Sequence, residues 1–369
     1  MITVVKMGSS PDTDPLRGER DKAFVSVVVP GYNEASIVAD HLQEICQYME
    51  TIENQYRWEL IFVNDGSSDA TGELAETFAR TRNNVFVLNH FRNFRLGQAL
   101  RYAFTHCRGD YVVTLDLDLS YSTDHIGKLL DKMKETRARI VIASPYVKEG
   151  KVSHVPWHRQ VLSVWANRYL SFTAPGNLST VTGMVRLYDA KFLKNLDLKA
   201  MDTEINEEII YKAQLMGAQI VEIPAHLDWG SHKARGKGRK SSLKIFKKVV
   251  SCLFSGFIFR PFMFFILPGL VLILLSLYPL GWALTHTFNS YFRLSGIHPN
   301  INFGHLFSAA VAEAFALSPH SFLVGGFTLI LAFQVISLGI VALQSKRYFE
   351  ELFHLGTTIY KFNRENGKE

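Results

Sequence analysis

The residues best suited to chemistry are two carboxylates, Asp116 and Asp118, which directly follow the apolar run 111–115. A predicted strand that ends in two carboxylates one residue apart presents hard oxygen ligands at the mouth of a sheet. Mg²⁺ and Mn²⁺ prefer such ligands, particularly when substrate phosphates complete the coordination shell. The pair therefore predicts a divalent-metal site, with a solvated acidic strand end as the alternative.

Three more predicted strands end in clusters of carboxylate, amide and hydroxyl side chains. The first cluster spans residues 30–34 (PGYNE), the second spans residues 64–69 (NDGSSD), and the third consists of Asn89, Arg92, Asn93 and Gly97. Turns use the same residue types, so turn chemistry is the alternative for any single cluster. Ligands bind beyond the carboxyl ends of parallel strands. Four strand ends that are followed by polar side chains at one edge therefore indicate a ligand site.

The elements that would position these clusters alternate along residues 24–143. Apolar runs at 24–30, 58–63, 85–88, 111–115 and 140–143 are typical of strands buried on both faces. Helices are expected between them: one carries Val38, Leu42, Ile45 and Met49, one is capped by Ser68 or Asp69 and carries Leu74 and Phe78, and two span 97–106 and 126–133. The alternation predicts an α/β fold with a parallel, doubly wound sheet. The chain lacks the glycine signatures of dinucleotide oxidoreductases and P-loop NTPases.

Together the strand-end motifs resemble family 2 glycosyltransferases with the GT-A fold. The motifs are P-x-Y-N-E, V-x-D-G-S-S-D, R-N-x-x-x-G and D-x-D-x-S, and the likeness covers about residues 24–230. A basic segment and two apolar runs farther along further resemble the polyprenyl-phosphate glycosyltransferases, the group that contains dolichyl-phosphate mannose synthase. The resemblance implies a GT-A doubly wound mixed sheet followed by a C-terminal region of two transmembrane helices.

The resemblance also implies roles for particular residues. It implies that Asp116 and Asp118 hold the divalent metal, Mg²⁺ or Mn²⁺, against the donor diphosphate, and that Asp118 is catalytic. It implies nucleotide contacts from one set of residues at the strand ends: Pro30, Tyr32, Asn33, Glu34, Asp65, Ser67 and Asp116. A metal that bridges diphosphate oxygens neutralises the charge that grows on the departing nucleotide, so the physical reading agrees with the implied roles.

The segment 179–188 resembles the family's G-x-x-R-L segment, which lies near the acceptor. Arg186 matches the family's arginine, and the resemblance implies a catalytic residue that binds a phosphate. The alternative is an arginine at a strand edge that pairs with a carboxylate. Residues 206–213 resemble a helix opening that carries an acidic base in many relatives. Two positions depart from the pattern, because Met184 and Asn206 stand where Asp is common.

Two carboxylates remain at that predicted helix start. Glu207 and Glu208 are candidates for the catalytic base, with Asp202 as a further candidate, but acidic residues in a first helical turn also simply offset the helix dipole. A phosphomonoester acceptor needs little help from a base, because its second pKa is about 6. A sugar hydroxyl acceptor would need one. The departures therefore favour a phosphate acceptor.

Two long uncharged runs predict membrane spans. Residues 261–285 hold no charged residue over 25 positions, and residues 321–344 hold none over 24. About 20 apolar residues suffice for a helix to cross the hydrocarbon core. Buried core helices are the alternative, but two such runs would need an unusually large domain to cover them.

The charge distribution predicts the orientation of these spans. Residues 232–248 hold eight Lys/Arg and no acidic residue, whereas the whole chain has 40 basic and 34 acidic residues. Lys346 and Arg347 follow the second run, and both basic flanks are expected on the cytoplasmic side. The polar start of the chain indicates no cleaved signal peptide. The three cysteines have no metal or disulfide spacing, as expected in a reducing compartment.

The basic segment itself has two interpretations. Arg235, Lys237 and Arg239 approximate the family's R-x-x-G-x-S-K tail, and a basic loop with glycines can wrap a donor diphosphate or acceptor phosphate. It would also attract anionic headgroups without any catalytic role. Residues 242–259 mix basic and apolar positions, which suits an amphipathic helix in the membrane interface.

The expected organisation has five parts: a polar tail (1–22), a cytoplasmic GT-A catalytic domain (23–231), a basic loop with an interfacial helix (232–260), two transmembrane helices with a short external loop (261–345), and a cytoplasmic tail (346–369). The expected activity is metal-dependent, inverting transfer of a sugar from a UDP- or GDP-linked donor to a polyprenyl phosphate at the cell membrane. Transfer to a hydroxyl acceptor and a non-catalytic nucleotide-sugar-binding subunit are the alternatives. We expect no nucleic-acid partner, and self-association into a homo-oligomer is left open.

Overall fold

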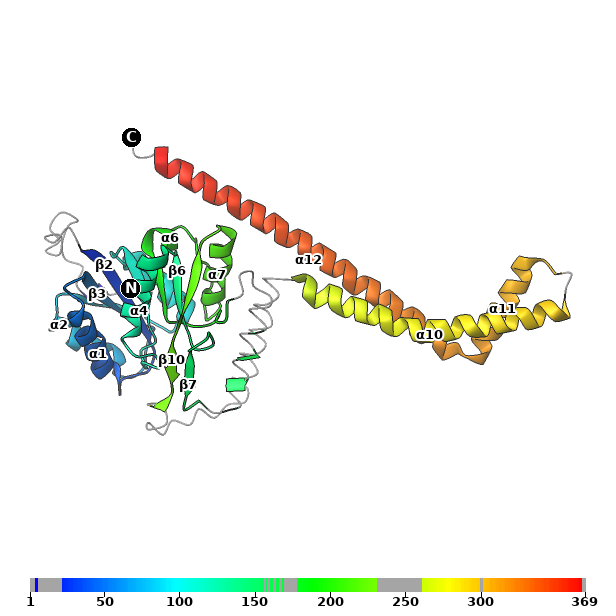
Figure 1. Cartoon of the computed structure of the whole chain (residues 1–369), viewed down its shortest axis with the longest axis horizontal. Helices are drawn as coiled ribbons and strands as arrows, with labels where there is room; N and C mark the ends of the chain where they lie inside the picture. The colour runs from blue at the N-terminus through cyan, green and yellow to red at the C-terminus, as the bar shows by residue number, and fades with distance from the viewer. Residues whose placement is uncertain are drawn as a thin grey trace. The chain divides into compact units, whose positions relative to one another are not determined.

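The computed structural model describes residues 4–5, 22–155, 178–230, 261–298 and 301–366, together with positions 157, 160, 161, 164, 165 and 168. The chain divides into two compact units, Met1–Ser255 and Gly256–Glu369. Figure 1 displays both units.

The N-terminal unit is built on an eight-stranded sheet of order β1-β4-β3-β2-β5-β8-β6-β9. Pairing is parallel between β2 and β3, β2 and β5, β3 and β4, and β6 and β9, whereas β8 runs antiparallel to both β5 and β6. The expected doubly wound mixed sheet is therefore confirmed. The strands are β1 (Val4–Val5), β2 (Ala23–Gly31), β3 (Tyr56–Asn64), β4 (Val85–Asn89), β5 (Tyr111–Thr114), β6 (Ile140–Ser144), β8 (Arg186–Asp189) and β9 (Ile220–Pro224).

The helices of this unit are α1 (Val38–Thr51), α2 (Thr71–Arg80), α3 (Leu96–His106), α4 (His125–Thr136), α6 (Ala190–Lys194) and α7 (Ile205–Leu215). The predicted helical spacing is confirmed in α1, which buries Val38, Leu42, Ile45 and Met49 against the sheet. The predicted cap of α2 by Ser68 or Asp69 is wrong. Its N-cap is Ala70, which makes no side-chain cap hydrogen bond, and Oδ1 of Asp69 accepts the backbone N–H of Thr71, the first residue of α2, at 3.0 Å.

The register of the strands brings the strand ends with polar clusters to one edge of the sheet. Gly31 of β2 pairs with Asn64 of β3, which pairs with Asn89 of β4. On the other side, Val28 pairs with Thr114 of β5, which pairs with Arg186 at the start of the reversed strand β8. The loops after β2, β3, β4 and β5 and the segment before β8 thus meet at the same edge of the sheet.

A small second sheet joins β7 (Lys151–Ser153) in parallel with β10 (His226–Asp228). It touches the main unit near the end of β5, because the backbone N–H of Asp228 donates to the carbonyl of Ser120 at 2.8 Å.

The C-terminal unit consists of α10 (Pro261–Ile297), α11 (Phe303–Leu317) and α12 (Pro319–Asn366). Two segments, Phe264–Ile297 and Pro319–Phe353, are long and apolar enough to cross a membrane, each with a mean hydropathy of 2.2. The two long apolar helices expected from the sequence are therefore present. The segment expected as a short external loop contains the additional helix α11, and α12 continues to Asn366 through the segment expected as a tail.

Candidate active site

Asp116 and Asp118 lie in a tight turn after β5. Leu119 adopts a left-handed backbone with φ of 51°, and its N–H donates to the carbonyl of Asp116 at 3.2 Å. Oδ1 of Asp118 accepts the backbone N–H of Ser120 at 2.9 Å and its hydroxyl at 2.6 Å. These bonds fix the carboxylate of Asp118, and both acidic side chains are half-buried.

The donor set suits a divalent cation that shares its ligands with a substrate. Among the described residues, no three His, Cys, Asp or Glu side chains converge on a point where they could hold a metal together. Asp116 and Asp118 supply hard oxygen ligands of the kind that Mg²⁺ and Mn²⁺ use together with phosphate oxygens and water. Burial, and next the negative charge of Asp116, raises the pKa of the neighbouring Tyr121. The two carboxylates make the turn electronegative, which suits a cation.

The loops after β2 and β3 bind each other directly. Asn33, at a φ of 55°, donates its backbone N–H to Oγ of Ser67 at 3.0 Å, and its Oδ1 accepts the N–H of Ser68 at 2.8 Å. The backbone N–H of Glu34 donates to Oγ1 of Thr71 at 2.8 Å. Two of the predicted nucleotide-binding residues, Asn33 and Ser67, are therefore in contact. Pro30 is half-buried at the end of β2, and the side chain of Tyr32 is exposed.

Asp65 is buried and holds the loop between β4 and α3. Its Oδ1 accepts the backbone N–H of Phe94 at 2.9 Å and lies 2.8 Å from Nδ1 of His90. Its Oδ2 accepts the backbone N–H of Arg95 at 2.8 Å. The turn at Gly66, which directly follows Asp65, is equally tight, because a Cβ on Gly66 would overlap the backbone of Arg92. Besides any role toward a nucleotide, Asp65 thus shapes one wall of the site.

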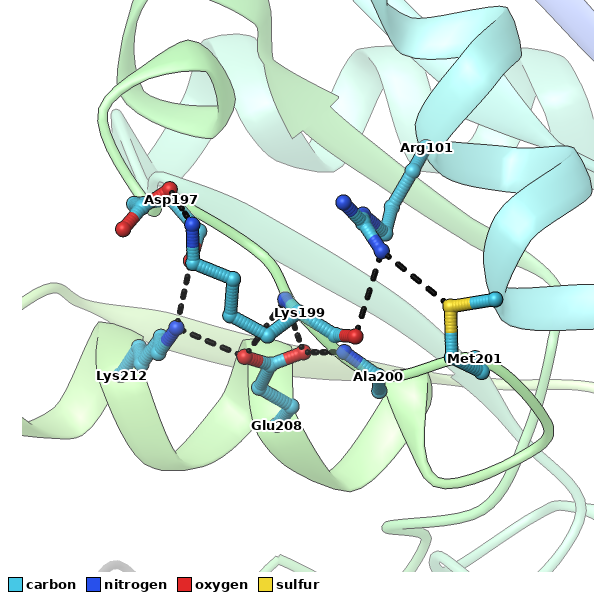
Figure 2. A network of polar contacts seen from close by, with 7 residues as sticks. All are labelled: Arg101, Asp197, Lys199, Ala200, Met201, Glu208 and Lys212. Carbon is cyan, nitrogen blue, oxygen red and sulfur yellow. Dashed lines mark hydrogen bonds and ion pairs between the residues drawn. The ribbon is translucent and has the colours of Figure 1, made fainter.

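Glu208 holds a second wall, the segment between α6 and α7. Figure 2 shows its carboxylate accepting the backbone N–H groups of Lys199 and Ala200 and the ammonium of Lys212. The distances are 2.9 Å to Lys199, 2.8 Å to Ala200 and 2.6 Å to Lys212. Lys212 in turn donates to the carbonyl of Asp197 at 2.6 Å. The carboxylate of Glu208 thus ties this segment to α7.

Helix α3 packs against the same segment. Arg101 donates to the carbonyl of Lys199 at 3.2 Å and also contacts Sδ of Met201 (Figure 2). A Cβ on Gly97 would overlap the backbone between Ala200 and Asp202. Arg95, whose N–H binds Asp65, pairs through its guanidinium with Asp202 at 3.0 Å. The wall held by Asp65 and the wall held by Glu208 are thereby joined.

Arg186 lies at the predicted edge but points into the protein. Its side chain is fully buried, and its guanidinium donates to the carbonyls of Asn206 at 2.8 Å and Val181 at 2.6 Å. These carbonyl contacts differ from both interpretations of the sequence, a phosphate and a carboxylate partner. In this conformation Arg186 joins the start of α7 to the segment before β8, and contact with a phosphate stays a prediction.

The segment 179–184 before β8 is anchored by side chains from four strands and a helix, and one of them is Ser144 of β6, whose hydroxyl bonds to the hydroxyls of Ser179 and Thr180. Glu222 of β9 accepts the N–H groups of Ser179 and Thr180, both at 2.8 Å, and the hydroxyl of Ser179 at 2.9 Å. The carbonyls of the segment are bound too: Arg186 binds Val181, the amide of Asn206 binds Thr182 at 3.4 Å, and Thr114 binds Met184 at 2.6 Å. The segment is therefore held by many hydrogen bonds although it has no regular secondary structure.

The remaining predicted residues divide into two groups. Glu207 lies in the first turn of α7 and is buried, with 8% of its surface exposed. Arg235, Lys237 and Arg239 lie outside the described residues, as does the predicted interfacial helix at 242–259.

Several residues that shape the site were not identified from the sequence. They are His90, Glu222, His154 and Asp228; the His154 imidazole lies 2.6 Å from Asp228 and lowers the pKa of that carboxyl. Only His90 had a usable signal, since it directly follows a predicted strand end. The others lie far along the chain from the residues that they support.

The same residues carry a family signature. Residues 26–197 match the sequence profile described as Glycosyl transferase family 2. The chain carries a glycosyl transferase family 2 domain. This domain contains the turn with Asp116 and Asp118, the loops after β2, β3 and β4, and Arg186.

Similar proteins cover different shares of the chain. A dolichyl-phosphate beta-glucosyltransferase of Trichomonas vaginalis is 30% identical over 154 residues, 40% of this chain and 47% of that protein. A polyprenol monophosphomannose synthase of Mycolicibacterium smegmatis is 29% identical over 208 residues, 54% of this chain and 75% of that protein. The chain thus spans about half the length of the first relative.

A solved glucosyl-3-phosphoglycerate synthase of Mycobacterium tuberculosis, in complex with Mn²⁺, UDP and phosphoglyceric acid, superposes with a TM-score of 0.47 at 17% identity. The superposition covers 63% of this chain and 78% of that chain.

Proposed function

We propose that this protein transfers a sugar from a UDP- or GDP-linked donor to a polyprenyl phosphate, with inversion at the anomeric carbon and with Mg²⁺ or Mn²⁺ as cofactor. The observation that carries the proposal is the fixed turn of Asp116 and Asp118 at the edge where the loops after β2 and β3 meet. Relatives named for dolichyl-phosphate and polyprenol monophosphate chemistry support the acceptor class.

In this mechanism the protein mainly positions charge. Asp116 and Asp118 would hold the cation, which when bound offsets the negative charge that grows on the nucleotide diphosphate as it leaves. Asn33, Asp65 and Ser67, in the loops after β2 and β3, orient the nucleotide of the donor. The acceptor phosphate attacks in line, opposite the nucleotide, so the configuration of the anomeric carbon inverts.

The state of the carboxylates favours a phosphate acceptor. A hydroxyl acceptor needs a base to remove its proton, whereas a phosphomonoester is ionised near neutral pH, since its second pKa is about 6. Glu208, one of the base candidates, is already bonded to two N–H groups and an ammonium. Glu207 is buried, and Asp202 pairs with Arg95. Glu208 and Asp202 are therefore already bonded to N–H or basic groups.

The proposed location is the cell membrane. The two candidate spans in α10 and α12 support it, and the basic residues 232–248 and Lys346–Arg347 favour a cytoplasmic catalytic domain with both termini in the cytoplasm. There the edge of the sheet that carries Asp116 would meet a nucleotide sugar from the cytoplasm and a lipid phosphate from the membrane.

The test is nucleotide diphosphate release by the purified protein, measured with a panel of nucleotide sugars and with Mg²⁺ or Mn²⁺, in the presence and absence of a polyprenyl phosphate. We expect one donor to give release that depends on the lipid. Release that depends instead on a hydroxyl acceptor would establish the first alternative. Binding of a donor with no release under any condition would establish a non-catalytic subunit.

A further inference from the structure

Contacts at glycines define how α10 and α12 pair. A Cβ on Gly269 would overlap Ile336, one on Gly325 would overlap Leu280, and one on Gly339 would overlap Phe265 and Ile266. The helices are therefore antiparallel, and residue 266 lies level with 339 and residue 280 with 325. The paired length of α10 runs from about 265 to 285, which at 1.5 Å per residue is about 30 Å, within the candidate span Phe264–Ile297.

The end of α10 continues beyond this paired length and packs against α11. Helix α11 buries Leu306, Ala310 and Ala314, at a spacing of four residues. Glu313 of α11 forms an ion pair with Arg293 of α10. We name residues 286–317 the far-side hairpin. Its 15-residue helix α11 is about 22 Å long and too short to cross a membrane.

The outward surface of the far-side hairpin is apolar. Its exposed side chains include Phe288, Phe292, Phe303, Phe307 and Phe315, with exposed fractions of 60, 69, 67, 47 and 43%. Arg293 and Glu313 are its only two residues of the Asp, Glu, Lys and Arg types, and they neutralise each other. A helix that faces water on one side carries a polar, charged face, which α11 lacks.

We propose that the far-side hairpin lies in the lipid bilayer interface, with its phenylalanines among the acyl chains. The inference rests on the membrane location in the proposed function. Lipid is the occupant because the apolar surface continues directly from both candidate spans, since α11 joins α12 through Ser318 alone. Histidines at 286, 298 and 305 and the paired Arg293 and Glu313 suit the polar headgroup level.

The test uses nitroxide labels in protein reconstituted into phosphatidylcholine vesicles. Phe307→Cys is labelled in a Cys252→Ser background, since Cys46 and Cys107 are buried. Collisions with oxygen report lipid, and collisions with a water-soluble nickel chelate report water. Leu274→Cys, 66% exposed in a candidate span, is the lipid reference. Asp131→Cys, exposed on α4, is the water reference.

We expect the label at 307 to collide with oxygen in preference to the nickel chelate, as the label at 274 does. A water-like result at 307 with a lipid-like result at 274 overturns the inference and leaves the membrane location intact. Water-like results at both positions reject the membrane location itself. Spin–spin broadening at 307 would show that a second copy of the chain covers the surface, which also overturns the inference. If Phe307→Cys does not fold, Phe315→Cys replaces it.

Discussion

Oδ1 of Asp65 lies 2.8 Å from Nδ1 of His90, and both side chains are buried. The same carboxylate accepts the backbone N–H groups of Phe94 and Arg95, so one acidic residue organises a whole loop. Since Arg95 also pairs with Asp202, a change at Asp65 should be felt in the segment that precedes α7.

Asp65→Asn should loosen the loop from His90 to Arg95. The amide nitrogen that replaces one carboxylate oxygen is a donor and cannot accept the N–H of Phe94 or Arg95. Removing one partner of a buried hydrogen bond costs about 1–3 kcal/mol. Hydrogen exchange of the Phe94 and Arg95 amides should accelerate, whereas Asp131→Asn, an exposed control on α4, should leave it unchanged. Unchanged protection in Asp65→Asn would show that the loop is held by other contacts.

Glu208→Gln should act on structure more than on proton transfer. The glutamine loses the charge that binds Lys212 and two N–H groups, and we expect the free energy of unfolding to fall by about 1–3 kcal/mol. Lys212→Met removes the other partner of the same ion pair, so it should lower stability and activity as Glu208→Gln does.

Lys132→Met, which removes an exposed ion pair with Glu135, is the matched control and should change little. A kcat loss of about 100-fold or more in Glu208→Gln, with thermal stability and the Lys212→Met variant unaffected, would instead identify Glu208 as a general base. That result would favour the hydroxyl acceptor.

Glu222→Gln should loosen the segment 179–184 and thereby weaken binding of the acceptor. The carboxylate of Glu222 binds two consecutive N–H groups and a hydroxyl, and glutamine can replace only part of this. If this segment faces the acceptor, KM for the polyprenyl phosphate should rise more than KM for the nucleotide sugar. Glu135→Gln, an exposed change, is the control. Equal effects on both KM values would place the segment away from the acceptor.

The ion pair between His154 and Asp228 should make local stability depend on pH. The hydrogen bond from His154 lowers the pKa of Asp228 below the unfolded value of about 3.9. A lowered carboxyl pKa contributes stability that is present above the unfolded pKa and is lost as the pH falls through the folded pKa. His154→Gln should raise the pKa of Asp228 toward its ordinary value, as measured by carbon chemical shifts of its carboxyl group.

The stability difference between the wild-type protein and His154→Gln should accordingly shrink as the pH falls below about 3.9. A difference that stays constant with pH would mean that the contact is not ionic.

Much of the sheet and its functional edge could be predicted from the sequence. Parallel strands that are buried on both faces have continuous apolar sequences. The residues that follow these strands must meet at one edge of the sheet. Asp116 and Asp118 were located in this way because strand and ligand are adjacent in the chain. The position of the antiparallel strand β8 between β5 and β6 could not be predicted from its own sequence, since its pairing depends on segments far apart in the chain.

The same limit applies to Arg186, Glu208 and Glu222. Their residue types suggest contacts with phosphate, a proton or solvent, but each is used to hold backbone groups of another segment. Such contacts depend on tertiary placement, which spacing along the chain does not encode. The far-side helix α11 was missed for a different reason, because its low charge and short length read as a loop between two spans.

The most direct test of the account compares Asp118→Asn with Asp131→Asn. The measurement is the rate of lipid-dependent nucleotide diphosphate release at saturating Mn²⁺ with the preferred donor. Loss of a metal ligand should lower the rate by more than about 100-fold, and the exposed control should retain wild-type activity. Comparable release by Asp118→Asn and the control would contradict a metal site at the end of β5.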